Sequence, residues 1–227
     1  MRGSPIVGVL LTNADLDHVL GLLLLREGDT LSVHATPAMR ESLLHGLNFQ
    51  ALLEVFCGIE WLEPSRNLKP LFIRTGEPSG LLHRAIPLPG DPPRFAGNAP
   101  DREGHGVAYQ IVDERTGGKL LVAPDVGSIT DDLLAALEEA DAILFDGTFW
   151  SEDELRQIRD SSRTASEMGH LPIGTGSIEC LRRLPARHKI YTHINNTNPI
   201  FRLDTPERVA VEAAGLTVGH DGLELEL

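Results

Sequence analysis

The sequence predicts an α/β fold. Short β-branched and apolar runs alternate along the chain with segments of helical pattern, and 41% of the 227 residues are hydrophobic, enough to bury a sizeable core. The length is about one and a half times a typical domain of roughly 150 residues, a size that layered α/β folds often reach without dividing. We therefore expect a single domain over residues 1–227.

Charge and composition argue against several classes of protein. The 20 basic and 33 acidic residues give a net charge of −13, which repels a nucleic-acid backbone over most of the surface. The longest apolar run, residues 19–25, is too short to span a membrane, and no signal peptide is visible. Cys57 and Cys180 lack a CxxC spacing and suggest reduced thiols. We expect a cytoplasmic protein with no nucleic-acid or membrane partner.

The first hundred residues predict strand and helix pairs followed by a less regular region. Thr36 and Pro37 have the types expected at a helix N-cap and first turn. Residues 64–100 carry much of the proline and glycine and could form a substrate-shaping loop. The predicted elements are strands at residues 6–11, 31–35, 71–75 and 82–87 and helices at 17–27 and 37–47.

The second half has a clearer pattern. Two alternating segments flank Thr116-Gly117-Gly118 and predict a hairpin, Thr130 and Thr205 are candidate N-caps, and Ser151 with Glu154 forms a capping box. A second hairpin is predicted to turn at Asp221-Gly222. The predicted elements are strands at residues 107–113, 119–123, 142–145 and 189–192, helices at 131–140, 177–184 and 206–215, a short helix after Ser151, and the final hairpin at 216–227.

Histidine and carboxylate side chains follow four of the predicted strands. They are Asp17-His18, Asp125, Asp146 and His193. Ligand sites in layered α/β proteins gather at the carboxyl ends of strands, and imidazole with carboxylate suits zinc, manganese or non-haem iron. A metal site is therefore the leading hypothesis from spacing alone.

Each of these residues also has a structural interpretation. Asp15 or Asp17 could cap the following helix, and Asx turns would explain the asparagines after His193. His105 and His170 lie in glycine-containing turns that could approach a ligand or only turn the chain. The remaining histidines have no such setting, and we expect surface positions for His34, His45, His83, His188 and His220.

Residues 10–21, Leu-Leu-Thr-Asn-Ala-Asp-Leu-Asp-His-Val-Leu-Gly, resemble the metallo-β-lactamase signature Thr-His-x-His-x-Asp-His followed by Gly. Asn13 and Asp15 stand where the signature has its first two histidines. His105, Asp125 and His193 resemble the later motifs of the superfamily. The resemblance implies an αββα sandwich in which one half of a dinuclear site is complete, with Asp17, His18, Asp125 and His193 as metal ligands.

The chain resembles the pyrroloquinoline quinone (PQQ) biosynthesis B family within this superfamily more closely. The likeness runs from residue 2 to the end, and its most specific part is Thr-His-Ile-Asn-Asn-Thr-Asn-Pro-Ile, because hydrolytic relatives generally share only the histidine there. The other matching segments are residues 2–13, 21–28, 98–100, 145–150 and 167–171.

This resemblance implies an oxygenase that uses iron(II), with zinc as the other candidate metal, and O₂ to hydroxylate the tyrosine ring of a glutamate-tyrosine precursor. His18 and His193 with Asp17 or Asp125 would supply a two-histidine, one-carboxylate set. The catalytic candidates are His105, His170 and Asp146. The candidates for binding the substrate are Asn195, Asn196 and Asn198.

Two other functions remain open, a zinc hydrolase or phosphodiesterase and a non-catalytic carrier of PQQ or its precursor. Family members usually have several dozen residues before the segment that matches residue 2 here, so we expect a sandwich short of its N-terminal strands. Such a sheet would leave an uncovered edge that invites aggregation or a homodimer.

Overall fold

The computed structural model describes residues 4–97, 103–158 and 163–227. The chain forms two compact units, Met1–Val107 and Ala108–Leu227, which are described separately below. The family segment at residues 98–100 lies outside the described residues. The expectation of one domain over the whole chain stays a prediction.

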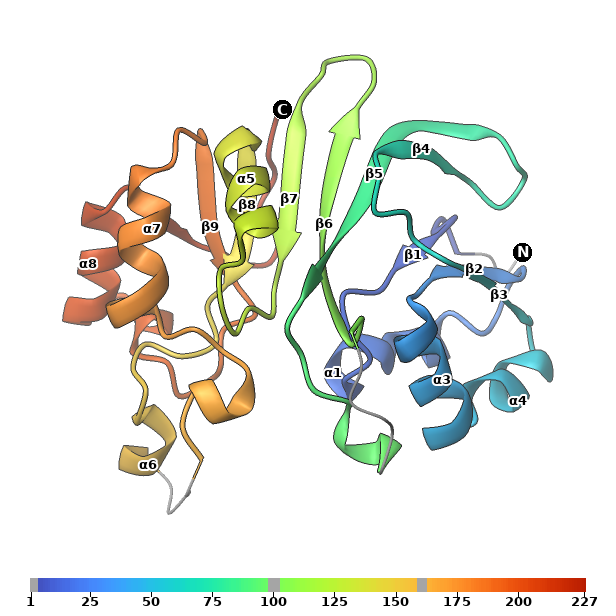
Figure 1. Ribbon diagram of the computed structural model, residues 1–227, viewed down its shortest axis with the longest axis horizontal. Coiled ribbons are helices and arrows are strands. Elements are labelled where there is room, and N and C mark those ends of the chain that lie inside the picture. Colours follow the sequence, from blue (N-terminus) through green and yellow to red (C-terminus); the bar gives the residue numbers. More distant parts are fainter. Residues whose placement is uncertain (1–3, 98–102, 159–162) are drawn as a thin grey trace. The chain divides into compact units, whose positions relative to one another are not determined.

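Unit 1 contains a three-stranded parallel sheet in the order β1-β2-β3 and an antiparallel strand pair, β4 and β5. Helices α3 and α4 pack together beside the three-stranded sheet (Figure 1). The strands are β1 (Val9–Leu10), β2 (Leu31–His34), β3 (Ile59–Leu62), β4 (Lys69–Phe72) and β5 (Pro78–Leu88). The helices are α1 (Leu16–Val19), α2 (Gly21–Leu24), α3 (Pro37–Gly46), α4 (Phe49–Glu54) and the 3₁₀ turn η1 (Arg94–Ala96).

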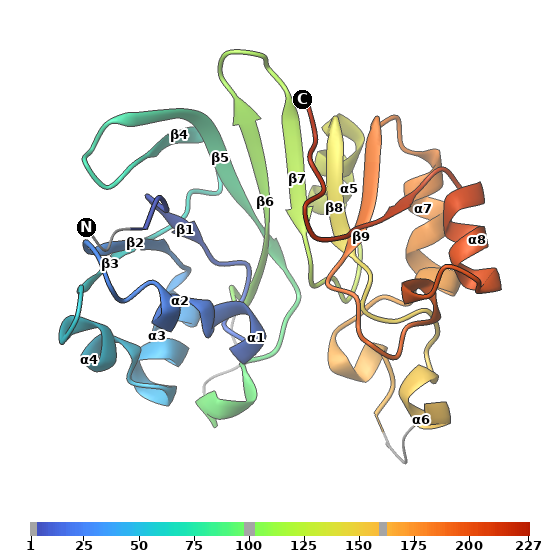
Figure 2. The ribbon, with the colours of Figure 1, turned by 180° about the vertical axis from the view of Figure 1, so that it is seen from behind.

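Unit 2 has five strands in the order β10-β9-β8-β7-β6, of which the first four are parallel and β6 is antiparallel to β7. Helices α5 and α7 cover the same face of these strands (Figures 1 and 2). The strands are β6 (Gly106–Asp113), β7 (Lys119–Ala123), β8 (Ala142–Asp146), β9 (His188–Thr192) and β10 (Thr217–Val218). The helical segments are α5 (Asp131–Glu139), α6 (Glu154–Ile158), η2 (Ser166–Met168), η3 (Ile173–Ser177), α7 (Ile178–Arg183), η4 (Pro199–Phe201) and α8 (Pro206–Ala213).

The strongest sequence signals are confirmed. Thr36, Thr130 and Thr205 each accept a hydrogen bond from a backbone N–H in the first turn of α3, α5 and α8. Helix α5 buries Leu133 and Leu137, four residues apart, as an amphipathic helix should. The predicted hairpin of β6 and β7 is present, with its strands in antiparallel register.

Three predicted elements are wrong in detail. The helix predicted at residues 17–27 is two short helices that meet at Leu20, beside Gly21, whose helix propensity is low. The strand predicted at 6–11 keeps two residues, Val9 and Leu10, which pair with β2 at one edge of the sheet as far as the structure describes it. The hairpin predicted at 216–227 does not form, since β10 pairs in parallel with β9 and no later strand is present in the described chain.

The surface positions predicted for His34 and His83 are also wrong. Their exposed fractions are 7% and 4%, and their rings meet edge to face with centroids 5.2 Å apart. Burial lowers the pKa of His34 to about 4 and also lowers the pKa of His83. Both rings are therefore neutral core side chains at pH 7, while His45 and His220 are exposed as predicted.

The parallel strands of unit 2 determine where polar residues gather. Strands β7, β8 and β9 run in one direction, so their carboxyl ends lie along one edge of the sheet. Asp146 is the last residue of β8, and Asp125 and His193 follow β7 and β9. No helix in the described part of the chain is long and apolar enough to cross a membrane.

We expect acid to destabilise the protein partly through His34. Its pKa falls from 6.5 in the unfolded chain to about 4 in the folded protein, so between these values the unfolded chain binds a proton that the folded protein does not. Lowering the pH from 7 to 4.5 should remove roughly 2 to 3 kcal/mol through this group. In urea unfolding, His34→Gln should therefore show a weaker pH dependence than the parent, and His45→Gln an unchanged one. Parallel pH curves for His34→Gln and the parent would contradict the assignment.

Candidate functional site

Four predicted site residues meet in unit 2. His170, in the turn after η2, places its Nδ1 2.8 Å from Asp146 Oδ2 and 3.4 Å from Asp125 Oδ1. His193 Nδ1 lies 3.9 Å from Asp146 Oδ1, and the two imidazole rings have centroids 5.7 Å apart. These four residues, which are spread over positions 125 to 193, thus converge on one edge of the sheet. For Asp125, Asp146 and His193 this is what the strand-end pattern predicts.

Asp146 is the centre of this cluster and has no exposed surface. Its Oδ1 accepts hydrogen bonds from the backbone N–H (2.9 Å) and hydroxyl (2.6 Å) of Thr148. Its Oδ2 accepts from the Val126 N–H at 2.9 Å and faces His170 Nδ1 at 2.8 Å. Each oxygen therefore uses two lone-pair positions, which makes this carboxylate an orienting group for the histidines and a poor direct ligand.

The electrostatics of the cluster favour ionised Asp146. Burial alone would raise its pKa, but the hydrogen bonds from His170 and Thr148 and the nearby imidazole of His193 outweigh burial and hold the pKa well below its usual range. Burial would lower the pKa of His170, yet its hydrogen bond to Asp146 and the charges of Asp146 and Asp125 raise it. The pair is thus a buried carboxylate with a proton held on His170 Nδ1.

His193 has an unusual backbone conformation. Its φ is 54°, in the left-handed region that few residues other than glycine adopt. Gly147 lies beside it and donates its N–H to the carbonyl of Thr192 at 2.8 Å. A Cβ at position 147 would come within 2.9 Å of that carbonyl oxygen, so the close approach of the two loops requires glycine.

The asparagines in the loop after His193 differ in how deeply they are buried. Asn198 is 2% exposed, donates its side-chain amide to the Gly147 carbonyl and accepts from the Ile200 N–H. This burial does not favour the substrate-binding role predicted for Asn198, because both of its side-chain groups are used within the protein. Asn195 is half-buried and Asn196 is exposed, so their predicted role stays open.

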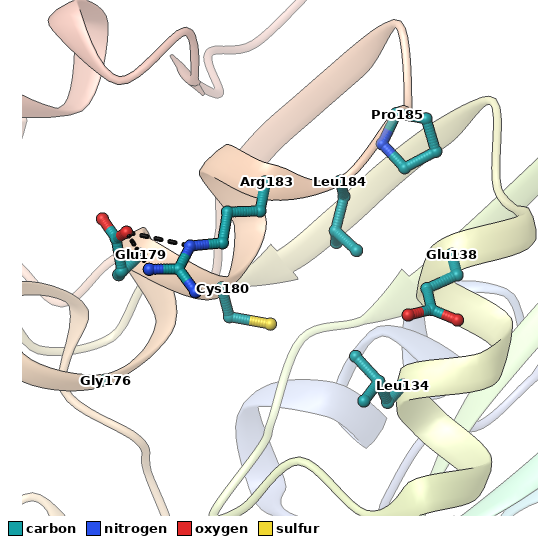
Figure 3. Close-up of a pocket in the computed structure, with 8 residues that line it drawn as sticks. All are labelled: Leu134, Glu138, Gly176, Glu179, Cys180, Arg183, Leu184 and Pro185. Atoms are coloured by element: carbon teal, nitrogen blue, oxygen red, sulfur yellow. Dashed lines mark hydrogen bonds and ion pairs between the residues drawn. The ribbon is translucent and has the colours of Figure 1, made fainter.

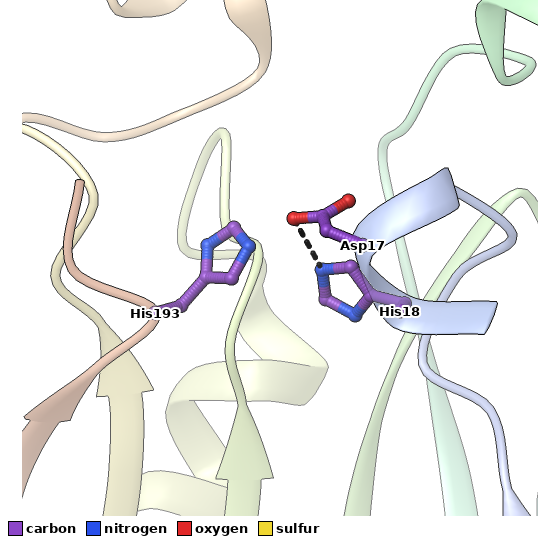
Figure 4. A group of neighbouring side chains, drawn as sticks. All are labelled: Asp17, His18 and His193. Atoms are coloured by element: carbon purple, nitrogen blue, oxygen red, sulfur yellow. Dashed lines mark ion pairs between the residues drawn. The ribbon is translucent and has the colours of Figure 1, made fainter. Parts of the chain in front are cut away.

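Unit 1 contains the other predicted residues. Figure 4 shows Asp17 and His18 on α1, with Asp17 Oδ2 3.8 Å from His18 Nε2. Thr12 Oγ1 lies 3.3 Å from His18 Nδ1. His105 is 3% exposed and lies next to Gly106. Gly106 forms an isolated antiparallel bridge with Asn13, in the segment just before α1. Unit 1 thus brings His105 close to the segment that precedes α1.

Asn13 also has a structural role. Its side-chain oxygen accepts a hydrogen bond from the Asp15 N–H at 3.2 Å, and the residue is 5% exposed. An amide oxygen in that arrangement is a weak substitute for the histidine of the superfamily signature.

The chemistry of the donors in unit 2 fits a divalent metal. Asp146, His170 and His193 have candidate ligand atoms within 4.8 Å of one another. Because Asp146 is already saturated by hydrogen bonds, the remaining donors of the cluster are the imidazole of His193 and the nearby Asp125 carboxylate, while His170 is held by its hydrogen bond to Asp146. Nitrogen and oxygen donors of this kind bind zinc or non-haem iron.

A separate hollow of about 650 Å³ in unit 2 is formed by residues of α5, α7 and the turn after α7 (Figure 3). Its Arg183 pairs with Glu179 at 2.6 Å, and burial raises the pKa of its Cys180 thiol. The lining residues therefore combine a neutralised ion pair with a protonated thiol. They contain none of the predicted site residues.

Comparison with known proteins decides the family. A family model described as the beta-lactamase superfamily domain matches residues 1–194. Coenzyme PQQ synthesis protein B of Cupriavidus necator is 38% identical over 236 residues, which cover 100% of this chain and 75% of the relative. The chain belongs to the coenzyme PQQ synthesis protein B family. The family member from Rhizobium meliloti is 40% identical and is covered over 74% of its length.

Solved structures agree with this family and confirm the metallo-β-lactamase-like α/β fold. Zn²⁺-bound PqqB from Methylobacterium extorquens has a TM-score of 0.84 and 35% identity, covering 100% of this chain and 75% of that one. A diphosphatase from the PhnP family has a TM-score of 0.64 at 20% identity, covering 98% and 72%, and shows the fold alone.

Sequence reasoning missed one residue of the cluster in unit 2. Thr148 is 7% exposed, and its hydroxyl lies between Asp146 and His193. The available signal was its position two residues after a strand-end aspartate, in Asp-Gly-Thr. Such a threonine suits an Asx or ST turn equally well, so sequence alone does not single it out.

We expect Asp146→Asn to destabilise the protein strongly. The amide would place an NH₂ group against hydrogen-bond donors that now face a carboxylate oxygen, leaving at least one buried donor unsatisfied. The expected loss is about 2 to 4 kcal/mol in urea unfolding of chelator-treated protein.

The control for that measurement is Asp153→Asn, which removes a carboxylate that is 54% exposed and paired with Arg156. Its loss should stay below about 1 kcal/mol. Equal losses in Asp146→Asn and Asp153→Asn would contradict the central role of the Asp146 carboxylate.

Proposed function

We propose that this chain acts in PQQ biosynthesis as a metal-dependent oxygenase that hydroxylates the tyrosine ring of a glutamate-tyrosine precursor. The observation that carries the proposal is the histidine and carboxylate cluster at the ends of β7, β8 and β9, in a chain that matches coenzyme PQQ synthesis protein B along its whole length. The zinc in the Methylobacterium extorquens relative supports a metal ion as cofactor.

The proposed metal ligands are Asp17 and His18 from unit 1 and Asp125 and His193 from unit 2. Iron(II) is the proposed metal and zinc the alternative, since both accept imidazole and carboxylate ligands. Bound iron(II) would supply the activation of O₂. In the overall reaction, one oxygen atom of O₂ replaces a ring hydrogen as hydroxyl, and the other leaves as water with two electrons and two protons from an added reductant.

The protein side chains would orient the substrate and hold protons. His170 keeps its Nδ1 proton directed at Asp146, which turns Nε2 outward from that carboxylate. His105 is the proposed acid–base group of unit 1. Asn195 and Asn196 are proposed to bind the carboxylates of the precursor, and Asn198 holds their loop in place.

Two other functions compete with hydroxylation. A zinc hydrolase of this fold uses the signature histidines that Asn13 and Asp15 replace here, and Asn13 is engaged in a hydrogen bond to Asp15. A carrier would bind finished PQQ tightly as metal-free protein. The two experiments below separate these alternatives.

The first experiment measures metal content. Protein purified without chelators should carry one equivalent of metal per chain, and His18→Ala or His193→Ala should lower it at least about tenfold, because each removes a proposed ligand. His45→Ala and His220→Ala, at exposed positions, should leave it unchanged. Elemental analysis by mass spectrometry measures the metal content of the parent and of each variant. Parental metal content in His18→Ala, or two equivalents in the parent, would overturn this assignment.

The second experiment measures oxygen use. With iron(II), ascorbate as reductant and a glutamate-tyrosine substrate, the chain should consume O₂ and add 16 mass units to the tyrosine ring, because the proposed reaction inserts one oxygen atom. Anaerobic samples should give no product. Turnover that is equal with and without O₂ would favour the hydrolase, and tight PQQ binding by metal-free protein without turnover would favour the carrier.

A further inference from the structure

The hydroxyl of Thr148 lies between the buried Asp146 carboxylate and the ring of His193. Thr148 Oγ1 is 2.6 Å from Asp146 Oδ1, 2.8 Å from His193 Nδ1 and 3.0 Å from the His193 carbonyl oxygen. All three residues belong to unit 2, and Asp146 and Thr148 are buried. One hydroxyl group therefore touches both the ring and the backbone of a proposed metal ligand.

Proton counting determines the direction of these hydrogen bonds. The hydroxyl has one proton and two acceptors, and the bond to the ionised carboxylate is shorter and charge-assisted, so the proton points to Asp146. The Thr148 oxygen is then an acceptor toward His193, and the group that donates to it is Nδ1–H. The ring proton is thereby fixed on Nδ1, and the lone pair lies on Nε2.

The backbone around His193 gives independent support. A φ of 54° is unfavourable for a residue other than glycine, so surrounding contacts must hold it. On either side of His193, Gly147 N–H donates to the Thr192 carbonyl at 2.8 Å and Asn195 N–H donates to the Thr148 carbonyl at 3.3 Å. These bonds fasten the Gly147-Thr148 segment to both flanks of the histidine.

Unit 1 contains a similar pair. Thr12 Oγ1 lies 3.3 Å from Nδ1 of His18, the other histidine proposed as a ligand. A threonine hydroxyl at Nδ1 is thus found beside both histidines, each within its own unit.

We propose that Thr148 is a positioning residue that links Asp146 to His193 by hydrogen bonds. It fixes the tautomer of His193 that is protonated on Nδ1, so that Nε2 is available to a divalent cation. The part concerning the cation rests on the proposed function. The part concerning the tautomer rests only on contacts within unit 2.

The test reads the tautomer directly in metal-free protein. Long-range ¹H–¹⁵N correlation spectra of ¹⁵N-labelled parent, with His193 assigned by its loss in His193→Gln, should show a protonated Nδ1 and an unprotonated Nε2. Thr148→Val removes the hydroxyl at nearly constant shape and should shift the ring toward the Nε2-protonated form, while Thr148→Ser should restore the parental pattern. The control is Thr217→Val, at an exposed position of β10, which should change nothing.

Zinc affinity supplies the second readout, by competition with a chromophoric chelator. Thr148→Val should bind Zn²⁺ roughly 10- to 100-fold more weakly than the parent, with Thr148→Ser close to the parent. A parental His193 protonated on Nε2 would overturn the proposal even if Thr148→Val fails to fold. An unchanged tautomer in folded Thr148→Val would also overturn it. A tautomer that follows Thr148 in a protein that binds no metal would uphold the positioning role and reject the metal-dependent function.

Discussion

The candidate site of unit 2 depends on one buried carboxylate. Asp146 lies at the end of β8 and receives backbone N–H groups from Val126 and Thr148. These fixed donors keep the carboxylate ionised in a place that solvent does not reach, despite the free-energy penalty of burying a charge. The ionised group in turn orients His170 directly and His193 through a hydroxyl. These hydrogen bonds favour a positioning role for Asp146, and the catalytic role predicted for it stays a prediction.

The fold was predictable where local signals agree with one another. Helices α3, α5 and α8 have a capping threonine, and α5 also has an apolar stripe in phase with its buried face. Prediction failed where the partner strand decides. Residues 217–218 alternate between an exposed and a buried side chain, as in any short strand. Only the position of β9 determines that they pair in parallel and do not form a hairpin. The buried ring of His34 packs against His83 of β5, a contact between residues 49 positions apart in sequence.

The candidate site was predictable for a related reason. Strand ends are visible in sequence, and a parallel sheet aligns them, so Asp125, Asp146 and His193 could be grouped before any coordinates. The strand pattern does not predict which role each of these residues has. Which carboxylate is saturated by hydrogen bonds, and which asparagine is buried, depends on how the loops pack, as Asn198 shows.

The left-handed backbone of His193 limits which residues can replace it. Asparagine, aspartate and glycine adopt that conformation with little strain, whereas alanine or a β-branched residue does not. Substitution by asparagine would therefore remove the imidazole and keep the turn. The backbone at this position therefore tolerates the loss of the imidazole, so the side chain and the turn can be separated by a single substitution.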